Sequence, residues 1–284
     1  MQTGRVFIHP AAARGRFREL ADLPEERLDL GEASLVIALE EYPRLDVPAY
    51  LERIERWAHA VRERTEGSAD PERILAQINR LLFEEEGFHG EGDDYYDPKG
   101  ALLNEVLDRH AGLPLALSIV YIEISRRAGL PAAGVSLPGR FLVRVAGSFG
   151  EIVIDPFDSG RVLTGMECQR IMDQVFGGAV KLSEHHLRPF GKREILARVL
   201  AHLKASHLAH RNVEAAIAAI DRILILDEND PYELRDRGMM AMQLHRYGEA
   251  TRFLERYLAA MPSAEDCSSV REQIEWIRAW LDEN

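Results

Sequence analysis

The hydrophobic positions of the chain follow a helical period, then an alternating one, then a helical period again. Apolar residues recur every three or four positions over three segments that each begin at an aspartate: 29–41, 46–66 and 70–82. That spacing is typical of amphipathic helices, and aspartate is a favourable N-cap because its carboxylate accepts hydrogen bonds from the first turn. The pattern therefore predicts three helices, and a shorter one follows at 101–109.

The most apolar helical segment covers residues 109–129 and is hydrophobic on nearly every face. Pro114 suits the first helical position, where a missing N–H costs nothing, and Gly129 suits the left-handed residue after the last turn. A helix that lacks a polar face belongs inside a domain. We therefore expect this helix to be buried and the domain to be organised around it.

From residue 141 the hydrophobic period becomes two. Two alternating segments flank a turn at 147–150, which predicts an antiparallel β-hairpin. Arg140 then lies at the start of one strand and Asp155 at the end of the other, so we expect the two side chains to form an ion pair. Arg140 itself cannot act as a general base, because a guanidinium group keeps its proton near neutral pH.

From residue 191 the pattern is helical to the end, and it repeats. The segment that starts at Val213 and contains Ala216 recurs, 34 residues later, at Tyr247 and Ala250, which is the tetratricopeptide period. Gly238 and Pro262 also occupy positions where that repeat has glycine and proline. A last helix over 268–281 is expected to cap the repeats, and we expect its residues Trp276 and Trp280 to pack in the core rather than to face a partner.

Short motifs in the first two thirds of the chain resemble the transglutaminase-like superfamily. They are Gly112-x-Pro114, Gly129-Leu130-Pro131-Ala132, Pro138-Gly139-Arg140-Phe141 and Ile154-Asp155-Pro156-Phe157. The resemblance implies that the nucleophilic cysteine of the family falls on Pro114, the catalytic histidine on Arg140 and the orienting aspartate on Asp155. Only the aspartate is retained, and proline offers neither a nucleophile nor a donor.

A larger set of motifs resembles the bacterial SirB-type family, which is described as regulators of sirC expression. The motifs are Gly87-Phe88, Asp94-Tyr95-Tyr96-Asp97-Pro98, Leu103-Asn104-x-Val106-Leu107, Gly112-Leu113-Pro114, Pro138-Gly139-x-Phe141-Leu142-Val143, Asp155-Pro156-Phe157 and Arg235-Asp236-Arg237-Gly238. The resemblance implies an α+β fold, in which a transglutaminase-like (papain-like) domain with a central buried helix and an antiparallel β-hairpin or sheet precedes an all-α TPR-like region. We expect an N-terminal arm at 1–28, the first domain at 29–190 and the repeats at 191–284.

Two classes of function follow from these motifs. The first is a non-catalytic regulatory or protein-interaction protein, whose degenerate cleft is lined by Tyr96, Asn104, Ser118, Arg140 and Asp155. The alternative is a hydrolase or acyl transferase with a rearranged active site, in which Ser118 replaces the missing nucleophile. A serine inside a helix more commonly donates to the carbonyl four residues earlier, which favours the first class.

Composition narrows the partners further. With 46% hydrophobic residues the chain is globular, and 35 Lys and Arg against 47 Asp and Glu give a net charge of −12, which disfavours direct nucleic-acid binding. We therefore expect a protein or peptide partner that binds the TPR-like region, and the sequence leaves the oligomeric state open.

Cysteine use and hydropathy indicate the compartment. Cys168 and Cys267 are too few for a disulfide framework, and Cys168 is expected to be a packed thiol. We expect a cytoplasmic protein without a membrane span, a cofactor or a metal. Asp93, Asp94 and Asp97 are close in sequence but lack the spacing of a calcium loop.

Overall fold

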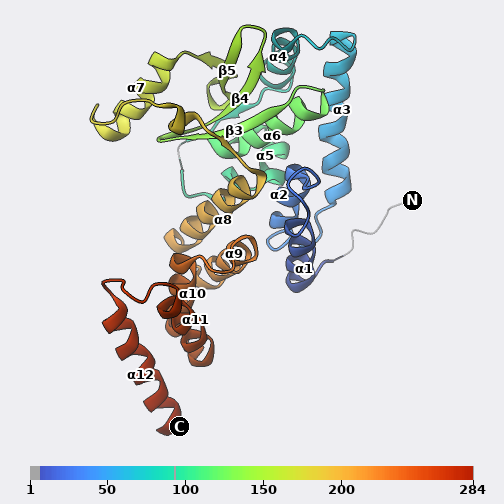
Figure 1. Cartoon of the computed structure of the whole chain (residues 1–284). Helices are drawn as coiled ribbons and strands as arrows, with labels where there is room; N and C mark the ends of the chain where they lie inside the picture. Colours follow the sequence, from blue (N-terminus) through green and yellow to red (C-terminus); the bar gives the residue numbers. More distant parts are fainter. Residues whose placement is uncertain (1–6, 93, 284) are drawn as a thin grey trace. The chain divides into compact units, whose positions relative to one another are not determined.

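The structure, a computed structural model, describes residues 7–92 and 94–283, so Asp93 lies outside the described residues. The chain divides into two compact units, residues 1–199 and 200–284 (Figure 1). The division falls inside helix α8 (Lys192–Ala209), whereas the sequence suggested a boundary between residues 190 and 191. A helical period cannot show which turns pack on which unit, and Ile195 of α8 lies against Gly134 of the first unit.

Three helices of the first unit begin directly after the aspartates that the sequence marks as their N-caps. Asp29, Asp46 and Asp70 each accept a hydrogen bond from a backbone N–H of the following first turn. The α-helices are α1 (Pro10–Ala21), α2 (Leu30–Ala38), α3 (Val47–Thr65), α4 (Pro71–Asn79), α5 (Leu103–Arg109), α6 (Pro114–Arg127) and α7 (Gly165–Phe176). A π-helical turn, η1 (Arg80–Glu85), extends α4, and short 3₁₀ turns are η2 (Pro98–Gly100), η3 (Pro156–Asp158) and η4 (Glu184–Leu187).

The sequence suggested an N-terminal arm over residues 1–28, but residues 10–28 pack against the rest of the first unit. They include helix α1, whose Phe17 is 1% exposed, and α1 packs against α2. Leu28, which precedes α2, is also buried. The helix was missed because its apolar positions are few and stand among arginines, so the sequence offers only a weak amphipathic pattern.

The main sheet of the first unit is antiparallel and has the strand order β6-β5-β4-β3-β7. Val143 lies opposite Ile154 and Gly147 opposite Gly150, which confirms the predicted hairpin. The strands are β3 (Ala132–Leu137), β4 (Arg140–Gly147), β5 (Gly150–Asp155), β6 (Arg161–Leu163) and β7 (Pro189–Phe190). A separate parallel pair consists of β1 (His89–Gly90) and β2 (Ala111–Gly112).

Helix α6 is the centre of this unit, as the sequence predicts. Residues 116–125 are all buried, and the helix packs against β3 and β4 and against α2, α3, α4 and α5 (Figure 1). Pro114 occupies the first turn, and Gly129 has a φ of 91°, the left-handed conformation that favours glycine after a helix.

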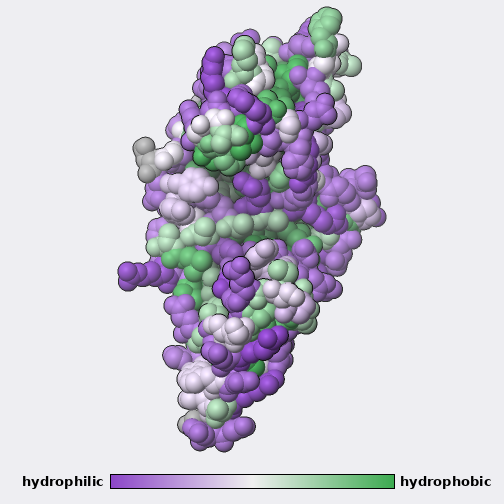
Figure 2. Space-filling view, turned by 60° about the vertical axis from the view of Figure 1, so that its left-hand side comes forward, coloured by the Kyte–Doolittle hydropathy of each residue, from purple (hydrophilic) through white to green (hydrophobic). Residues whose placement is uncertain are grey.

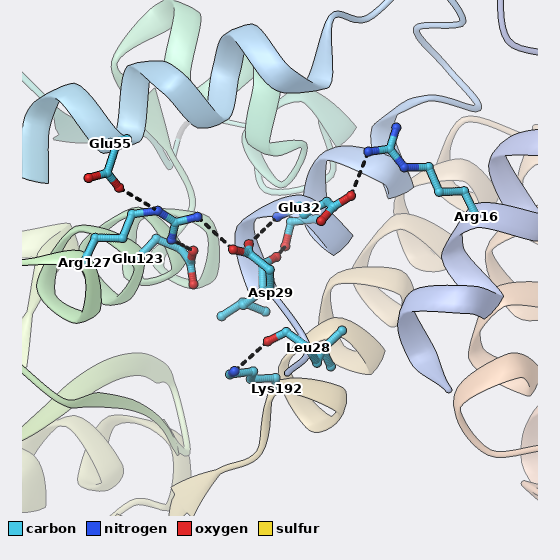
Figure 3. Close-up of polar contacts among 10 residues, drawn as sticks. Arg16, Leu28, Asp29, Glu32, Glu55, Glu123, Arg127 and Lys192 are labelled. Carbon is cyan, nitrogen blue, oxygen red and sulfur yellow. Dashed lines mark hydrogen bonds and ion pairs between the residues drawn. The ribbon is translucent and has the colours of Figure 1, made fainter. Parts of the chain in front are cut away.

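A polar cluster joins the C-terminal end of α6 to its neighbours (Figure 3). Arg127 forms ion pairs with Glu123 one turn earlier, with Asp29 at 2.8 Å and with Glu55 at 3.6 Å. Lys192 donates a hydrogen bond from Nζ to the carbonyl of Leu28. Burial raises the pKa of the Glu123 carboxyl and lowers that of the Lys192 ammonium, since each charge has been moved out of water.

The second unit is built from helix pairs. Its helices after α8 are α9 (Val213–Leu226), α10 (Pro231–Gln243), α11 (Tyr247–Ala260) and α12 (Cys267–Glu283). Helices α9 and α11 start at the two positions that the 34-residue repeat predicts, and Ala216 and Ala250 are fully buried. A Cβ atom on Gly238 would lie 2.6 Å from Cγ of Leu254, so glycine is what lets α10 approach α11.

The face of the protein shown in Figure 2 is mostly hydrophilic, and its hydrophobic side chains gather in separate patches. Among residues 7–92 and 94–283, no helix combines the length and the apolar character that crossing a membrane requires. The same residues contain no group of three or more His, Cys, Asp or Glu side chains arranged to hold a metal ion.

Candidate functional site

The candidate site begins at the two ends of the hairpin. Arg140 is the first residue of β4 and Asp155 the last residue of β5, and Nε of Arg140 lies 3.6 Å from Oδ2 of Asp155. The ion pair expected from the sequence is therefore present. The distance is too long for a hydrogen bond, and Nε of Arg140 is buried with no hydrogen-bond partner among the described residues.

Asp155 is fixed by its surroundings. It is 2% exposed, and its Oδ1 accepts a hydrogen bond of 3.0 Å from the N–H of Phe157 in η3. Burial raises the pKa of the Asp155 carboxyl above its ordinary value, and the charge of Arg140 offsets only part of this effect. The Arg140 guanidinium lies 4.6 Å from the centre of the Phe157 ring, which gives it a second, cation–π contact.

Helix α7 lies beside this pair because of a glycine turn. Gly139 between β3 and β4 has a φ of 89°, and a Cβ atom there would lie 2.8 Å from Val175 of α7. The helix itself starts with a capping box, in which Thr164 and Glu167 each bond the other's backbone N–H. Because Gly139 precedes Arg140 directly, its contacts with Ile171 and Val175 bring α7 close to Arg140.

A pocket of about 470 Å³ lies between these elements. It is lined by Arg140, Asp155, Phe157, Asp158, Arg161, Glu167, Arg170, Ile171 and Gln174. None of these lining residues, all from the described part of the chain, is a Cys, Ser or His. Three arginines face three carboxylates, so the pocket can pair with charged or polar groups, but its lining presents no thiol, hydroxyl or imidazole group.

Pro114 does not line the pocket. It is half-buried at the start of α6, where the resemblance to transglutaminases would have a cysteine. The preceding strand β2 is close-packed, since a Cβ atom on Gly112 would lie 2.7 Å from Val106. The start of the central helix therefore carries no reactive group.

Ser118 is fully buried and does not reach the pocket. Its hydroxyl donates to the carbonyl of Phe141 in β4 at 3.3 Å, not to Pro114 four residues earlier, so the expected hydrogen-bond partner was wrong. The carbonyl that accepts this hydrogen bond belongs to strand β4, so reasoning from the helix sequence alone could not identify it. A serine without exposed surface cannot attack a substrate.

The remaining expected cleft residues lie elsewhere. Asn104 is buried in α5, and its Oδ1 has no hydrogen-bond partner among the described residues. Tyr96 is 47% exposed and packs edge-to-face on Tyr95, with ring centres 5.4 Å apart. Neither lines the pocket, so of the five cleft residues proposed from the sequence the structure brings only Arg140 and Asp155 together.

Cys168 is a packed thiol, as expected. It is 1% exposed within a hydrophobic cluster that includes Leu142 and Met172. Burial raises the pKa of the thiol, and the charges of Glu167 and Asp155 add to that effect, so the reactive thiolate is disfavoured. Cys267, in the second unit, is also buried and not in a disulfide.

Several pocket residues were missed by sequence reasoning. Phe157 was visible only as part of the Asp155-Pro156-Phe157 motif, and Arg161 and Arg170 had no signal that connected them with the hairpin. The amphipathic pattern of α7 predicts a helix with one buried face, but not the strand ends against which that face packs.

Comparison with known proteins places these observations in a family. The family model of the transglutaminase-like superfamily matches residues 48–201, and that of the tetratricopeptide repeat matches residues 203–275. A UPF0162 protein of Xylella fastidiosa (strain 9a5c) is 36% identical over 258 residues, which cover 90% of this chain and 92% of that protein.

Two further likenesses are more distant. Protein SirB1 of Salmonella typhimurium is 26% identical over 263 residues, covering 92% of this chain and 97% of SirB1. A crystal structure of menin has a TM-score of 0.43 at 11% identity, covering 91% of this chain and 72% of menin. The family models and the Xylella relative show that the chain belongs to the SirB-type (UPF0162) family, with a transglutaminase-like domain followed by tetratricopeptide repeats.

Proposed function

We propose that this protein is a non-catalytic regulatory protein that acts by binding other proteins. The observation that carries the proposal is the Arg140–Asp155 ion pair, at the positions where the resemblance to transglutaminases implies a catalytic histidine–aspartate pair. An arginine cannot exchange a proton near neutral pH, and Pro114 supplies no nucleophile. The pocket has polar groups suited to holding a ligand, but it lacks the thiol and the imidazole that the resemblance to transglutaminases implies for catalysis.

The tetratricopeptide repeats support the binding part of the proposal. Stacked helix pairs of this kind commonly present a surface to a peptide or a protein. The net charge of −12 opposes direct contact with nucleic acid phosphates, so we infer that regulation runs through a protein partner. Two buried cysteines outside any disulfide fit the reducing cytoplasm.

The competing hydrolase or acyl transferase reading requires a reactive side chain near the pocket. Ser118, which the sequence offers as a replacement nucleophile, and the thiol of Cys168 are both buried. The raised pKa of Cys168 also keeps that thiol protonated. Neither observation favours the enzyme class.

The proposal is tested by covalent labelling and by an acyl-transfer assay on the full chain. We expect iodoacetamide and a fluorophosphonate probe to leave the folded protein unlabelled, and we expect no incorporation of dansylcadaverine into casein above the blank. A P114C/R140H variant serves as the control, because it restores the family's thiol and imidazole at the matching positions. Stoichiometric labelling of the wild-type chain under native conditions, or measurable amine incorporation, would overturn the proposal.

A further inference from the structure

A second pocket lies entirely within the repeat unit. It has a volume of about 610 Å³ and is formed by the end of α10, the start of α11 and one face of α12. It is lined by Met242, Gln243, His245, Tyr247, Ser269, Glu272, Gln273 and Trp276. Its lining differs from that of the first pocket, because within the described residues it contains no lysine or arginine.

Aromatic rings form one wall of this pocket. Trp276 is 53% exposed, and its ring centre lies 5.8 Å from that of Tyr247 at an angle of 73°. Trp280, one turn further along α12, covers the other part of Tyr247 at 4.5 Å. The expectation that both tryptophans pack in the core was therefore wrong. Ile277 takes the buried face of α12, which leaves the tryptophan edge at the surface.

Hydrogen-bond acceptors complete the pocket. Glu272 lies one helical turn before Trp276, on the same face of α12, is exposed and forms no ion pair among the described residues. Oε1 of Gln273 is buried and has no hydrogen-bond partner among them either. The Nδ1 atom of His245 is already engaged by the Tyr247 hydroxyl at 3.0 Å. The pocket thus offers an exposed carboxylate and the exposed ring of Trp276, and both attract a cation.

We propose that this pocket binds the side chain of an arginine in a peptide segment of the partner protein. The proposal rests on the proposed function, because it names the chemistry of the partner that the repeats would recognise. A guanidinium group is planar, so it stacks on the face of Trp276 while its N–H groups donate to the exposed carboxylate of Glu272.

The charge of the whole unit supports a basic partner. Residues 200–284 contain ten Lys and Arg against fifteen Asp and Glu, so the unit is acidic as well as the pocket. A negative surface raises the association rate of a basic segment and slows that of an acidic one, and salt weakens the effect. An arginine anchored between aromatic rings beside a carboxylate matches both the local and the wider charge.

Four fluorescein-labelled peptide libraries test the inference against the full-length protein by fluorescence anisotropy. Each has random residues around one fixed central residue, which is arginine, citrulline, lysine or glutamate. Citrulline has almost the shape of arginine but carries no charge. We expect the arginine library to bind about tenfold more tightly than the citrulline library, and we expect binding to weaken with added salt.

Matched variants locate the binding. Glu272→Gln removes the pocket carboxylate, whereas Glu275→Gln removes the same charge from an exposed position of α12 that does not line the pocket. We expect E272Q to lose about fivefold in affinity for the arginine library and E275Q to lose little. Trp276→Leu keeps an apolar side chain but removes the ring face, and it should also cost about fivefold.

Several outcomes would overturn the inference. They are equal binding of the arginine and citrulline libraries, tighter binding of the lysine or glutamate library, equal effects of E272Q and E275Q, and no binding of any library. The proposed non-catalytic function is tested by different measurements, because covalent labelling and amine incorporation detect reactive groups in the first unit. If the protein binds no arginine peptide but also does not react with iodoacetamide or the fluorophosphonate probe, only the proposed arginine site is refuted.

Discussion

Arg140 supplies a positive charge to a carboxylate that the fold buries. The Asp155 carboxylate accepts a hydrogen bond from the N–H of Phe157 and is almost fully covered, so the nearby guanidinium helps to stabilise its ionised form. The burial of the carboxyl already raises the pKa of Asp155, and the charge of Arg140 opposes that rise. Removing Arg140 should therefore raise this pKa further and leave a buried charge without a cation.

We expect Arg140→Gln to lower the free energy of unfolding by about 1–2 kcal/mol at neutral pH. The loss should shrink as the pH falls through the raised pKa of Asp155, because a protonated carboxyl no longer needs the arginine. Urea unfolding at neutral and at acidic pH measures both quantities. The control is Arg161→Gln, because Arg161 pairs with Asp158 and both side chains are 54% exposed. It should change stability by less than about 0.5 kcal/mol. An R140Q loss that is the same at both pH values would contradict this account.

The contacts of a single residue can be predicted from the sequence when its partner is close in the sequence or lies on an adjoining strand. Arg140 and Asp155 sit on two strands joined by a short turn, so the alternating pattern was enough to bring them together. Ser118 bonds Phe141, which is 23 residues away on a strand that packs across α6, and no helical period contains that contact. Arg170 reaches the pocket only because α7 packs at the hairpin's end.

At the scale of elements, the repeat unit depends on how closely α10 approaches α11. A Cβ atom at Gly238 would meet the Leu254 side chain at 2.6 Å and its backbone nitrogen at 3.2 Å. Backbone cannot move aside as easily as the end of a flexible side chain. The sequence identified this glycine from the repeat period, and the helix contact supplies the physical reason for it.

We expect Gly238→Ala to destabilise the protein by about 1–3 kcal/mol, since the added methyl group forces the two helices apart. Gly248→Ala is the matched control on α11, because nothing lies within 4 Å of a Cβ atom at that position. Alanine there should be neutral or stabilise by up to about 1 kcal/mol, since it is the better helix former. Thermal unfolding of both variants decides the question, and equal melting temperatures for the two would refute the close-approach argument.

Element boundaries were predictable wherever a cap marks them. The helices that start after Asp29, Asp46 and Asp70 begin at the expected positions, because side-chain capping is a local interaction. Helix α1 has no such acidic signal. Phe17 is buried and the helix packs against α2, which only the tertiary structure shows. Trp276 and Trp280 recur at helical spacing but lie at the surface. Helical spacing identifies an apolar face of α12 but does not show whether another element packs on it.

At the scale of the whole molecule, the order of the two parts was predictable and their boundary was not. The change from an alternating to a repeated helical pattern marks the start of the repeats, but α8 is one continuous helix across the division. The first unit also contains a partly buried polar cluster that no sequence motif indicated. Glu123 lies on the otherwise apolar central helix and pairs with Arg127, whose other partners come from outside α6 (Figure 3).

Glu123 should make the stability of the first unit depend on pH. Its folded-state pKa is raised by burial, so the folded chain holds a proton that the unfolded chain releases above about pH 4.5. Wild-type stability should therefore fall with rising pH relative to Glu123→Gln, which cannot titrate. Urea unfolding in steps from mildly acidic to neutral pH measures the difference. Glu55→Gln, which removes an exposed partner of the same arginine, should show almost no such trend. If wild type instead gains on E123Q as the pH rises, Arg127 rather than burial sets the pKa of Glu123.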